Sequence, residues 1–399
     1  MAAMAQVSAA FPPPSGTTRY VSHSGSDTPP YDTPETAASH IQDAINVADP
    51  GDTVLVDDGF YNERIEIDIP LRLVSVHGRD VTTINNPDTP YPAVAIFSDG
   101  VSVGESETGF TIQQFYDYAA LGFPPNAAIG INGYDVGPDG VNVQSCRLAG
   151  LYAAYGILVD GTISGGHLSI SDVQIGLPDS MSLSNYYSFR VGIEFTSCFD
   201  CGEDALGGGD PALFNAQVHI ENVSITSWEN IGIEFPEYYG GIYKSTLEIF
   251  ESNISNPSFS QNDHTAISFN DQIRALSDVS VASVTIANVD RGLHADTVTE
   301  TSSLDIYDGT WTDVHSVGVD LSNLDNSGFV SVSGMTLTGT FGTESAGIYV
   351  NSQFYLAFLY ISNNTISRFD YAPIALADVA DSLAVTQVVG NQLSDGHYS

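Results

Sequence analysis

Acidic and polar side chains recur at one position of a short segment that the sequence repeats. The segments "GIEFT" and "GIEFP" both carry a glutamate as their third residue, and these two residues are Glu194 and Glu234. The equivalent residues of two later segments are His294 and Asp320. Carboxyl and imidazole groups transfer protons in enzymes, so these four side chains are the predicted catalytic residues.

The spacing of the repeat indicates what these groups would do together. On adjacent strands, about 4.8 Å apart, Glu194 and Glu234 would lie near the separation of paired catalytic carboxylates. One would then act as an acid with a raised pKa, or both would share a calcium ion. His294, with Asp296 two residues on and Asp320 one repeat away, is a candidate acid or base. The alternative is a solvated acidic stripe without catalysis, which a chain with 49 Asp and Glu residues would also show.

Residues with hydrogen-bonding or aromatic side chains occupy the neighbouring outward positions of the same segments. In an extended strand every second side chain points to the same face, so these side chains are expected beside the catalytic candidates. The predicted substrate-binding residues are Asp160, Asn270, Asp296, Tyr349 and Asn351.

The elements that position these side chains follow from a pattern that recurs nine times. Apolar residues stand at offsets zero, two and seven, and the copies begin 27, 50, 29, 32, 25, 26, 29 and 27 residues apart. Intervals of this size are typical of solenoid proteins. The copies begin at Val141, Leu168, Val218, Leu247, Val279, Leu304, Val330, Leu359 and, more weakly, Thr386.

Each repeat has room for short strands and turns but not for a helix. Alternation at offsets zero and two is strand periodicity, and the third apolar position falls on another strand after a turn. A further strand, usually opened by glycine, lies between copies. Such strands must stack in parallel on their equivalents, which predicts an all-β fold, a β-helix whose turns bury their apolar residues against each other.

The N-terminal part of this coil has its own predicted elements. Thr33 is a plausible N-cap with Pro34 in the first turn, and apolar residues at helical spacing then predict an amphipathic helix over 33–49 that covers the open end. Strands follow, with the segment Gly59, Tyr61 and Glu63. With the repeat, these residues resemble the right-handed parallel β-helix, or pectin-lyase-like, superfamily, from about residue 19 to 399. The resemblance implies a single-domain coil.

The resemblance does not extend to one enzyme family. Polygalacturonase-like hydrolases would carry an N-T-D motif, paired aspartates and a G-H-G motif on consecutive turns, and these are missing or out of order. The "DFIFG" and "LGRPW" motifs of pectin-methylesterase-like proteins are absent as well. Pectate-lyase-like enzymes need calcium and a basic residue, for which Arg274 and Arg291 are candidates.

Composition limits the partners. The formal net charge is −39, with 10 Lys and Arg residues, so the chain would repel nucleic acid. This charge fits a halophilic or marine setting or bound calcium, since ions screen or neutralise carboxylates. Hydrophobic residues make up 42%, which excludes disorder. No apolar window is long enough for membrane insertion.

Two segments lie outside the regular repeat. Residues 1–18 are expected to be a flexible N-terminal segment or a signal-peptide remnant, which indicates export. Residues 176–217 are predicted to form a long loop insertion that contains Cys198 and Cys201. Their spacing fits a local disulfide, a redox pair or half a metal site, and without a second CxxC a structural zinc site is disfavoured.

Two functions are compatible with these observations. The first is an extracellular or cell-surface protein that binds a polysaccharide or cell-surface glycan along the outward face, and cleaves it as a lyase or a glycoside hydrolase. The second is a structural or adhesive protein of a cell or virion surface, such as a fibre or tail-spike-like subunit. The second would self-assemble as a trimer or filament, because no C-terminal cap is visible in the sequence.

Overall fold

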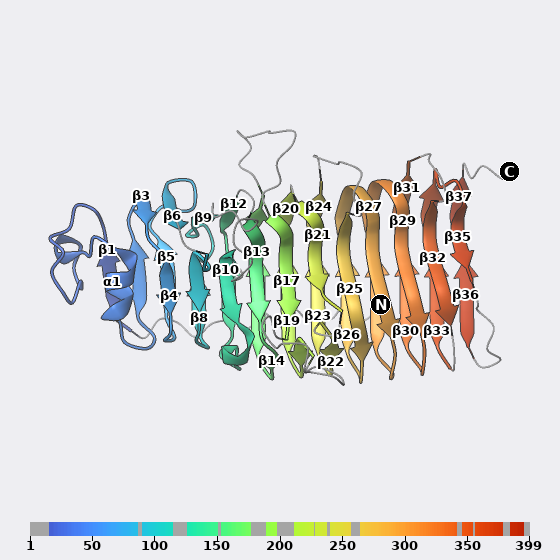
Figure 1. Cartoon of the computed structure of the whole chain (residues 1–399), viewed down its shortest axis with the longest axis horizontal. Helices are drawn as coiled ribbons and strands as arrows, with labels where there is room; N and C mark the ends of the chain where they lie inside the picture. Colours follow the sequence, from blue (N-terminus) through green and yellow to red (C-terminus); the bar gives the residue numbers. More distant parts are fainter. Residues whose placement is uncertain are drawn as a thin grey trace.

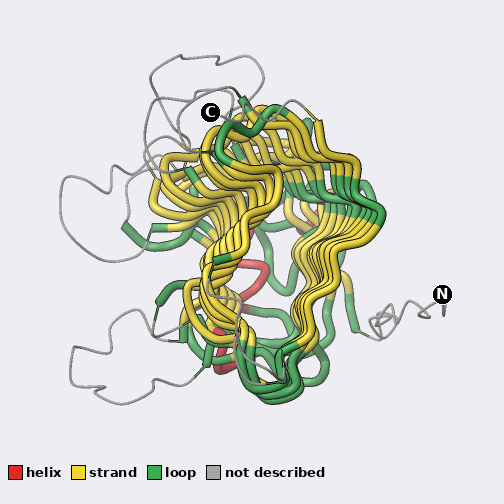
Figure 2. The backbone as a smooth tube through the Cα atoms, turned by 90° about the vertical axis from the view of Figure 1, so that its right-hand side faces the viewer, coloured by secondary structure: helices red, strands yellow, loops and turns green. Residues whose placement is uncertain are grey.

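The chain forms an elongated stack of short strands that pair in parallel (Figure 1). The computed structural model describes residues 16–86, 90–114, 126–150, 153–176, 189–197, 211–226, 228–237, 240–256, 264–340, 345–353, 356–377 and 384–394. Seen along the long axis, the successive turns lie over one another around a common interior (Figure 2). The predicted parallel β-helix is therefore present, and one turn of it is called a rung below.

Two parallel sheets run the length of the described coil. The first sheet has 13 strands, in spatial order β1 (Thr18–Val21), β2 (Thr53–Val56), β5 (Arg72–Ser75), β8 (Val101–Val103), β11 (Val141–Gln144), β15 (His167–Ser171), β19 (Gln217–Glu221), β23 (Thr246–Phe250), β26 (Asp278–Ala282), β28 (Ser303–Tyr307), β30 (Phe329–Ser333), β33 (Phe358–Ser362) and β36 (Val385–Val389).

The second sheet bends around the rest of each rung and has 24 strands. In chain order these are β3 (Gly59–Asn62), β4 (Ile65–Ile67), β6 (Thr82–Asn86), β7 (Val94–Ile96), β9 (Thr111–Gln114), β10 (Ala127–Asn132), β12 (Arg147–Gly150), β13 (Ala153–Asp160), β14 (Ile163–Ser164), β16 (Gln174–Ile175), β17 (Phe189–Thr196), β18 (Leu213–Phe214), β20 (Ser224–Thr226), β21 (Trp228–Phe235), β22 (Ile242–Tyr243), β24 (Asn253–Ser255), β25 (Thr265–Arg274), β27 (Thr285–Val298), β29 (Thr310–Leu324), β31 (Thr336–Gly339), β32 (Ala346–Gln353), β34 (Thr365–Ser367), β35 (Ala372–Leu376) and β37 (Gln392–Ser394).

The nine copies of the apolar pattern are in register with one another. Their first residues pair along the first sheet from Val141 to Thr386. Their third apolar residues form a second column, in the order Leu148, Ile175, Ile225, Ile254, Ile286, Trp311, Leu337, Ile366 and Leu393. All of this second column except Leu393 is buried, so the pattern is the core of the coil.

One residue in each of these rungs turns the chain from the first sheet to the second with a left-handed backbone. Its φ lies between 46° and 70° at Ser145, Asp172, Asn222, Glu251, Ser283, Asp308, Gly334, Asn363 and Gly390. The amide of each turn residue from Ser145 to Asn363 donates to a carbonyl of the next rung. Small, polar or glycine residues tolerate this conformation best, which explains the polar gap in the repeated pattern.

The expected helix over 33–49 is wrong in length. Residues Pro34–Thr36 form a 3₁₀ turn (η1) capped by Thr33, and the α-helix α1 covers only Ile41–Asn46. Between them, Ala38 bridges in parallel to Val21 of β1, and this extended pairing interrupts the helix. The apolar side chains of α1 are buried and the helix contacts β1, β2 and β4 at one end of the coil (Figure 1).

Glu63 links α1 to the strands. Its two carboxylate oxygens accept hydrogen bonds from the backbone amides of Ile41 and Gln42, at 2.8 and 3.0 Å. These amides have no partner inside the helix, because they belong to its first turn. The glutamate of the segment Gly59, Tyr61 and Glu63 is therefore the N-terminal cap of α1.

The range 176–217 is not one loop. It contains β17 and β18, which stack on the neighbouring rungs, and only 177–188 and 198–210 lie outside the described residues. Cys198 and Cys201, with the alternatives given for them, lie outside the described residues. So do residues 1–15 of the N-terminal segment. No helix in the described ranges is long and apolar enough to cross a membrane.

Candidate functional site

The predicted outward column is present in the second sheet. Register pairs connect Leu158 to Glu194, Glu194 to Glu234, and then continue through four more rungs to Ser268, His294, Asp320 and Tyr349. The catalytic candidates therefore stand on five consecutive rungs, with Ser268 between Glu234 and His294.

A stack of aromatic rings supports this column from inside the coil. Phe195 and Phe235 are parallel with centroids 4.7 Å apart, and Phe269 follows at 5.3 Å. Each ring belongs to the residue directly after one of the outward side chains, and all three are buried. Close-packed rings leave the strands little freedom, so they fix the spacing of the outward side chains.

An open hollow of ≈ 550 Å³ lies on this face. Its lining residues are Glu234, Glu237, Asn270, His294 and Asp296. Four of these were predicted from the strand pattern. Glu237 was not, because it follows the end of β21 and no strand periodicity reaches it.

Glu194 lies beside the hollow in a buried position. Its exposed fraction is 7%, and it does not line the hollow itself. Burial raises the pKa of Glu194 to about 8, with a further rise from the charge of Glu234, while Arg190 opposes the shift. Burial also raises the pKa of Glu234. At neutral pH the pair therefore retains at least one proton, and it titrates as a coupled unit.

His294 is held by the next rung. Its Nδ1 atom lies 3.0 Å from a carboxylate oxygen of Asp320, and both side chains are mostly buried. A carboxylate at Nδ1 favours the tautomer with the proton on that nitrogen, which leaves Nε2 as the atom that can accept a proton. The imidazole lines the hollow, so it has the position of a base.

Three predicted substrate-binding residues lie outside the hollow. Asp160 pairs with Thr196 and adds a negative charge near Glu194. Tyr349 pairs with Asp320, and its hydroxyl lies 3.4 Å from the side-chain oxygen of Asn351. These residues extend the polar face on both sides of the hollow along the coil axis.

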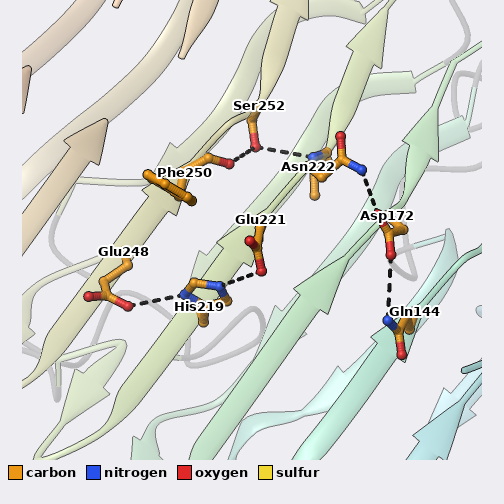
Figure 3. A network of polar contacts seen from close by, with 9 residues as sticks. Gln144, Asp172, His219, Glu221, Asn222, Glu248, Phe250 and Ser252 are labelled. Carbon is orange, nitrogen blue, oxygen red and sulfur yellow. Dashed lines mark hydrogen bonds and ion pairs between the residues drawn. The ribbon is translucent and has the colours of Figure 1, made fainter. Parts of the chain in front are cut away.

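A second histidine cluster lies on the first sheet and was not predicted. His219 of β19 contacts Glu221 through Nε2 and Glu248 of β23 through Nδ1, both at 3.1 Å (Figure 3). The two contacts link the imidazole to a carboxylate on its own strand and to one on the next rung. Near it, Asn222 donates to Asp172 at the turn, which ties adjacent rungs together.

Possible metal ligands converge at the first turn of the coil. Side-chain atoms of Asp57, Asp58 and His77 lie within 4.8 Å of one another in the described residues. The Nδ1 atom of His77 is 2.8 Å from Asp58, and both side chains are about half exposed or more. A hydrogen bond already accounts for this contact.

Known proteins resemble the chain in fold. No protein-family model matches the sequence, and no curated protein sequence matches it. The Yersinia enterocolitica family 28 exopolygalacturonase is similar with 11% identity over 90% of this chain and 75% of its own, at a TM-score of 0.42. A Eubacterium ramulus GH136 lacto-N-biosidase is similar with 9% identity over 95% and 68%, at 0.47.

A third solved structure, the pectin methylesterase from Yersinia enterocolitica, is 13% identical over 62% of this chain and 79% of its own, at a TM-score of 0.35. Similarities at TM-scores below 0.5 assign neither a family nor an activity to the chain. Its parallel β-helix is shown by the strand pairing described above.

Proposed function

We propose that this protein binds a polysaccharide or cell-surface glycan along the outward column of the second sheet and hydrolyses a glycosidic bond in the hollow. One observation carries the proposal. Glu234, whose pKa is raised by burial and which stands beside Glu194, and His294, oriented by Asp320, both line the same hollow of ≈ 550 Å³.

Glu234 would be the general acid. Glycoside hydrolysis needs a proton donor at the leaving oxygen, and a carboxyl group with a raised pKa supplies it near neutral pH. Burial raises the pKa of Glu234, and Glu194 lies on the adjacent strand. Glu194, whose own pKa is about 8, would return a proton to Glu234 after each cycle and regain one from solvent, while His294 releases to solvent the proton that it took from the attacking water.

His294 would activate the attacking water. It stands two strands from Glu234, with Ser268 between them, which separates the strands by about 9.6 Å at the usual spacing. This separation leaves room for a water molecule between base and sugar, as in hydrolases that invert the anomeric configuration. The proposal therefore predicts a product of inverted configuration.

Polar residues around the hollow would hold the sugar. Asn270 and Asp296 line it, and carboxylate and amide groups bind sugar hydroxyls by hydrogen bonds. Tyr349 and Asn351 would contact units further along the coil axis. An extended glycan fits because the strands that carry the column, β17, β21, β25, β27 and β29, follow one another along the long axis of the coil (Figure 1).

The proposed steps use side chains of the chain alone. Calcium binding at Glu194 and Glu234 would require their ionised forms, which burial disfavours in the absence of an ion. Binding of calcium elsewhere on the acidic surface is a separate proposal, tested by calorimetry with and without a chelator.

A structural or adhesive role is the second candidate, and one observation favours it. On the last described rung, Val388 and Leu393 occupy core positions but are 44% and 50% exposed. Their register partners Ile361 and Ile366 are buried. Exposed apolar side chains of this kind suit contact with another apolar surface. Both candidates place the protein outside the cell or on its surface.

A glycan screen with turnover analysis tests the first candidate. The purified protein is incubated with neutral and acidic oligosaccharides, and products and their anomeric form are followed by NMR. Glu234→Gln and His294→Gln should each abolish turnover while Glu248→Gln, on the other sheet, leaves it unchanged. Full turnover by both hollow variants would refute the site. Filaments without glycan turnover would favour the structural role.

A further inference from the structure

A second cluster of polar and aromatic side chains lies on the segments that follow the strands of the outward column, at β18, β22 and the end of β25. Phe214 of β18 and Tyr243 of β22 are register partners, and their rings stack with centroids 5.3 Å apart and planes within 4°. Phe214 is 39% exposed. Two stacked rings at the surface form a flat apolar patch, the kind of surface on which sugar rings stack.

Two cationic side chains flank this pair of rings. The ammonium group of Lys244 lies 5.1 Å from the Tyr243 ring centroid, and the guanidinium of Arg274, the register partner of Tyr243 on β25, lies 5.6 Å from it. Lys244 is the one lysine of the chain, and Arg274 is one of nine arginines. We call Phe214, Tyr243, Lys244 and Arg274 the platform.

Neither cation of the platform forms an ion pair within the described residues. The Arg274 guanidinium donates a hydrogen bond to the side-chain oxygen of Gln272 at 3.4 Å, and Asp271 interacts with it over a longer distance. Among the described residues, no carboxylate lies within 4.0 Å of either Lys244 or Arg274, although 49 acidic residues are available. The Nε atom of Arg274 is buried and makes no hydrogen bond within the described part of the chain. By contrast, Arg19, Arg64, Arg72 and Arg147 all form ion pairs.

The platform borders the hollow. The two share strand β25, in which Asn270 lines the hollow and Arg274 follows four residues later. Asp271, between them in sequence, interacts electrostatically with both Arg274 and Asp296. A glycan bound in the hollow would therefore have a neighbouring unit at the platform. The hollow itself is lined by three carboxyl groups, which disfavour an anionic sugar there.

We infer that the platform is a subsite for a single sugar unit that carries an anionic substituent, a sulfate ester or a carboxylate. The substrate would then be a largely neutral glycan with isolated anionic units. A continuous polyanion fits less well, because the acidic hollow and the net charge of −39 would repel its other units. This inference rests on the proposed glycan-binding function and names the substrate class.

Matched glycans test the inference. A glycan array carries neutral oligosaccharides together with the same backbones bearing one sulfate or one carboxylate, and calorimetry then measures the best matched pair. The anionic member should bind more tightly, and the sulfate and carboxylate arms show which group is preferred. Equal affinity for the neutral and anionic members, or binding of neither, would overturn the inference.

Variants locate the effect. Lys244→Gln combined with Arg274→Gln should lower the preference for the anionic member by about three- to tenfold, as expected for two partly exposed ion pairs. The exposed Lys244→Gln change alone should show part of this loss with the fold intact. Arg147→Gln, which removes a cation paired with Asp80, is the matched control and should have no effect.

The two proposals fail separately. Glu234→Gln should stop turnover but keep the preference for the anionic glycan, because Glu234 is not part of the platform. A protein that cleaves glycans but shows no preference for the anionic member refutes the platform and leaves the hollow intact. If the variant with both Lys244→Gln and Arg274→Gln keeps the wild-type preference for the anionic glycan, the platform is likewise refuted and the hollow is unaffected.

Discussion

The Nδ1 atom of His294 lies 3.0 Å from a carboxylate oxygen of Asp320, its register partner on the next strand. The contact joins two rungs across the floor of the proposed site. Such a carboxylate sets the tautomer and the direction of the imidazole rather than touching the substrate.

Asp320→Asn should therefore lower kcat with little change in KM. Removal of a general base usually costs about 10²- to 10⁴-fold, so His294→Gln should fall in this range and Asp320→Asn should cost less. Rescue by the conservative variant Asp320→Glu is the second readout, because a carboxylate at this position can again accept the Nδ1–H of His294. Asp278→Asn, on the first sheet, is the control. A kcat for Asp320→Asn equal to that of the wild type would show that the contact is only structural.

The pH dependence of stability tests the protonation of Glu194. Its folded pKa of about 8 lies above the usual value of 4.5, so the folded state keeps a proton that the unfolded state loses. Stability from this group is complete below about pH 4.5 and is lost as the pH rises to 8, with a slope of about 1.4 kcal/mol per pH unit.

Glu194→Gln should remove that slope, so the variant should be more stable than the wild type at pH 8 and similar to it at pH 4.5. Urea unfolding at several pH values measures the difference. Glu237→Gln, with an exposed side chain, controls for the loss of one charge. Parallel stability curves for Glu194→Gln and the wild type would contradict a raised pKa.

The turn residues predict a pair of opposite effects on stability. Glu251 has a φ of 46°, and Gly334 occupies the same position with a φ of 66°. Glu251→Gly should raise the free energy of unfolding by about 0.5–1 kcal/mol, because glycine adopts this conformation at low cost. Glu251→Gln removes the same charge without relieving the backbone and should not reproduce the gain.

Gly334→Ala should lower the free energy of unfolding by about 1–2 kcal/mol. A Cβ atom there would lie 2.4 Å from a carboxylate oxygen of Asp308, in addition to the unfavourable φ. Thermal or urea unfolding of both variants gives the comparison. An unchanged Gly334→Ala protein would mean that the turn is free to rearrange.

The cap of α1 gives a further prediction. Glu63→Ala leaves the amides of Ile41 and Gln42 without their acceptor and should cost about 1–2 kcal/mol of stability. Hydrogen exchange should rise first at residues 41–46. Glu66→Ala, where the side chain is 52% exposed, is the control. No change in exchange at α1 would show that packing alone holds the helix.

The sequence predicted the coil and the outward column because both depend on local periodicity. Strand alternation assigns each side chain to a face, and equal intervals bring Glu194 and Glu234 into register. The rung of Val101 and Val103 was missed because the next core residue, Ile112, follows at offset eleven instead of seven. The helix was overestimated because the pairing of Ala38 with Val21 is not local.

The chemistry of the site was less accessible to prediction. The burial of Glu194 depends on packing around its strand, including Leu158 beside it on β13, and not on the identity of its own neighbours in sequence. The platform combines residues of three rungs, namely Phe214 of β18, Tyr243 of β22 with Lys244 directly after it, and Arg274 of β25. Unpaired cations become recognisable only when the surrounding carboxylates have been located in space.

The left-handed turns also have a consequence for how such a chain changes in evolution. Because every turn returns the backbone to the same place above its predecessor, copying or deleting the residues between two turns keeps the parallel register of the remaining strands. The molecule can therefore gain or lose length in whole units, and the distance between the hollow and either end can vary without a new fold.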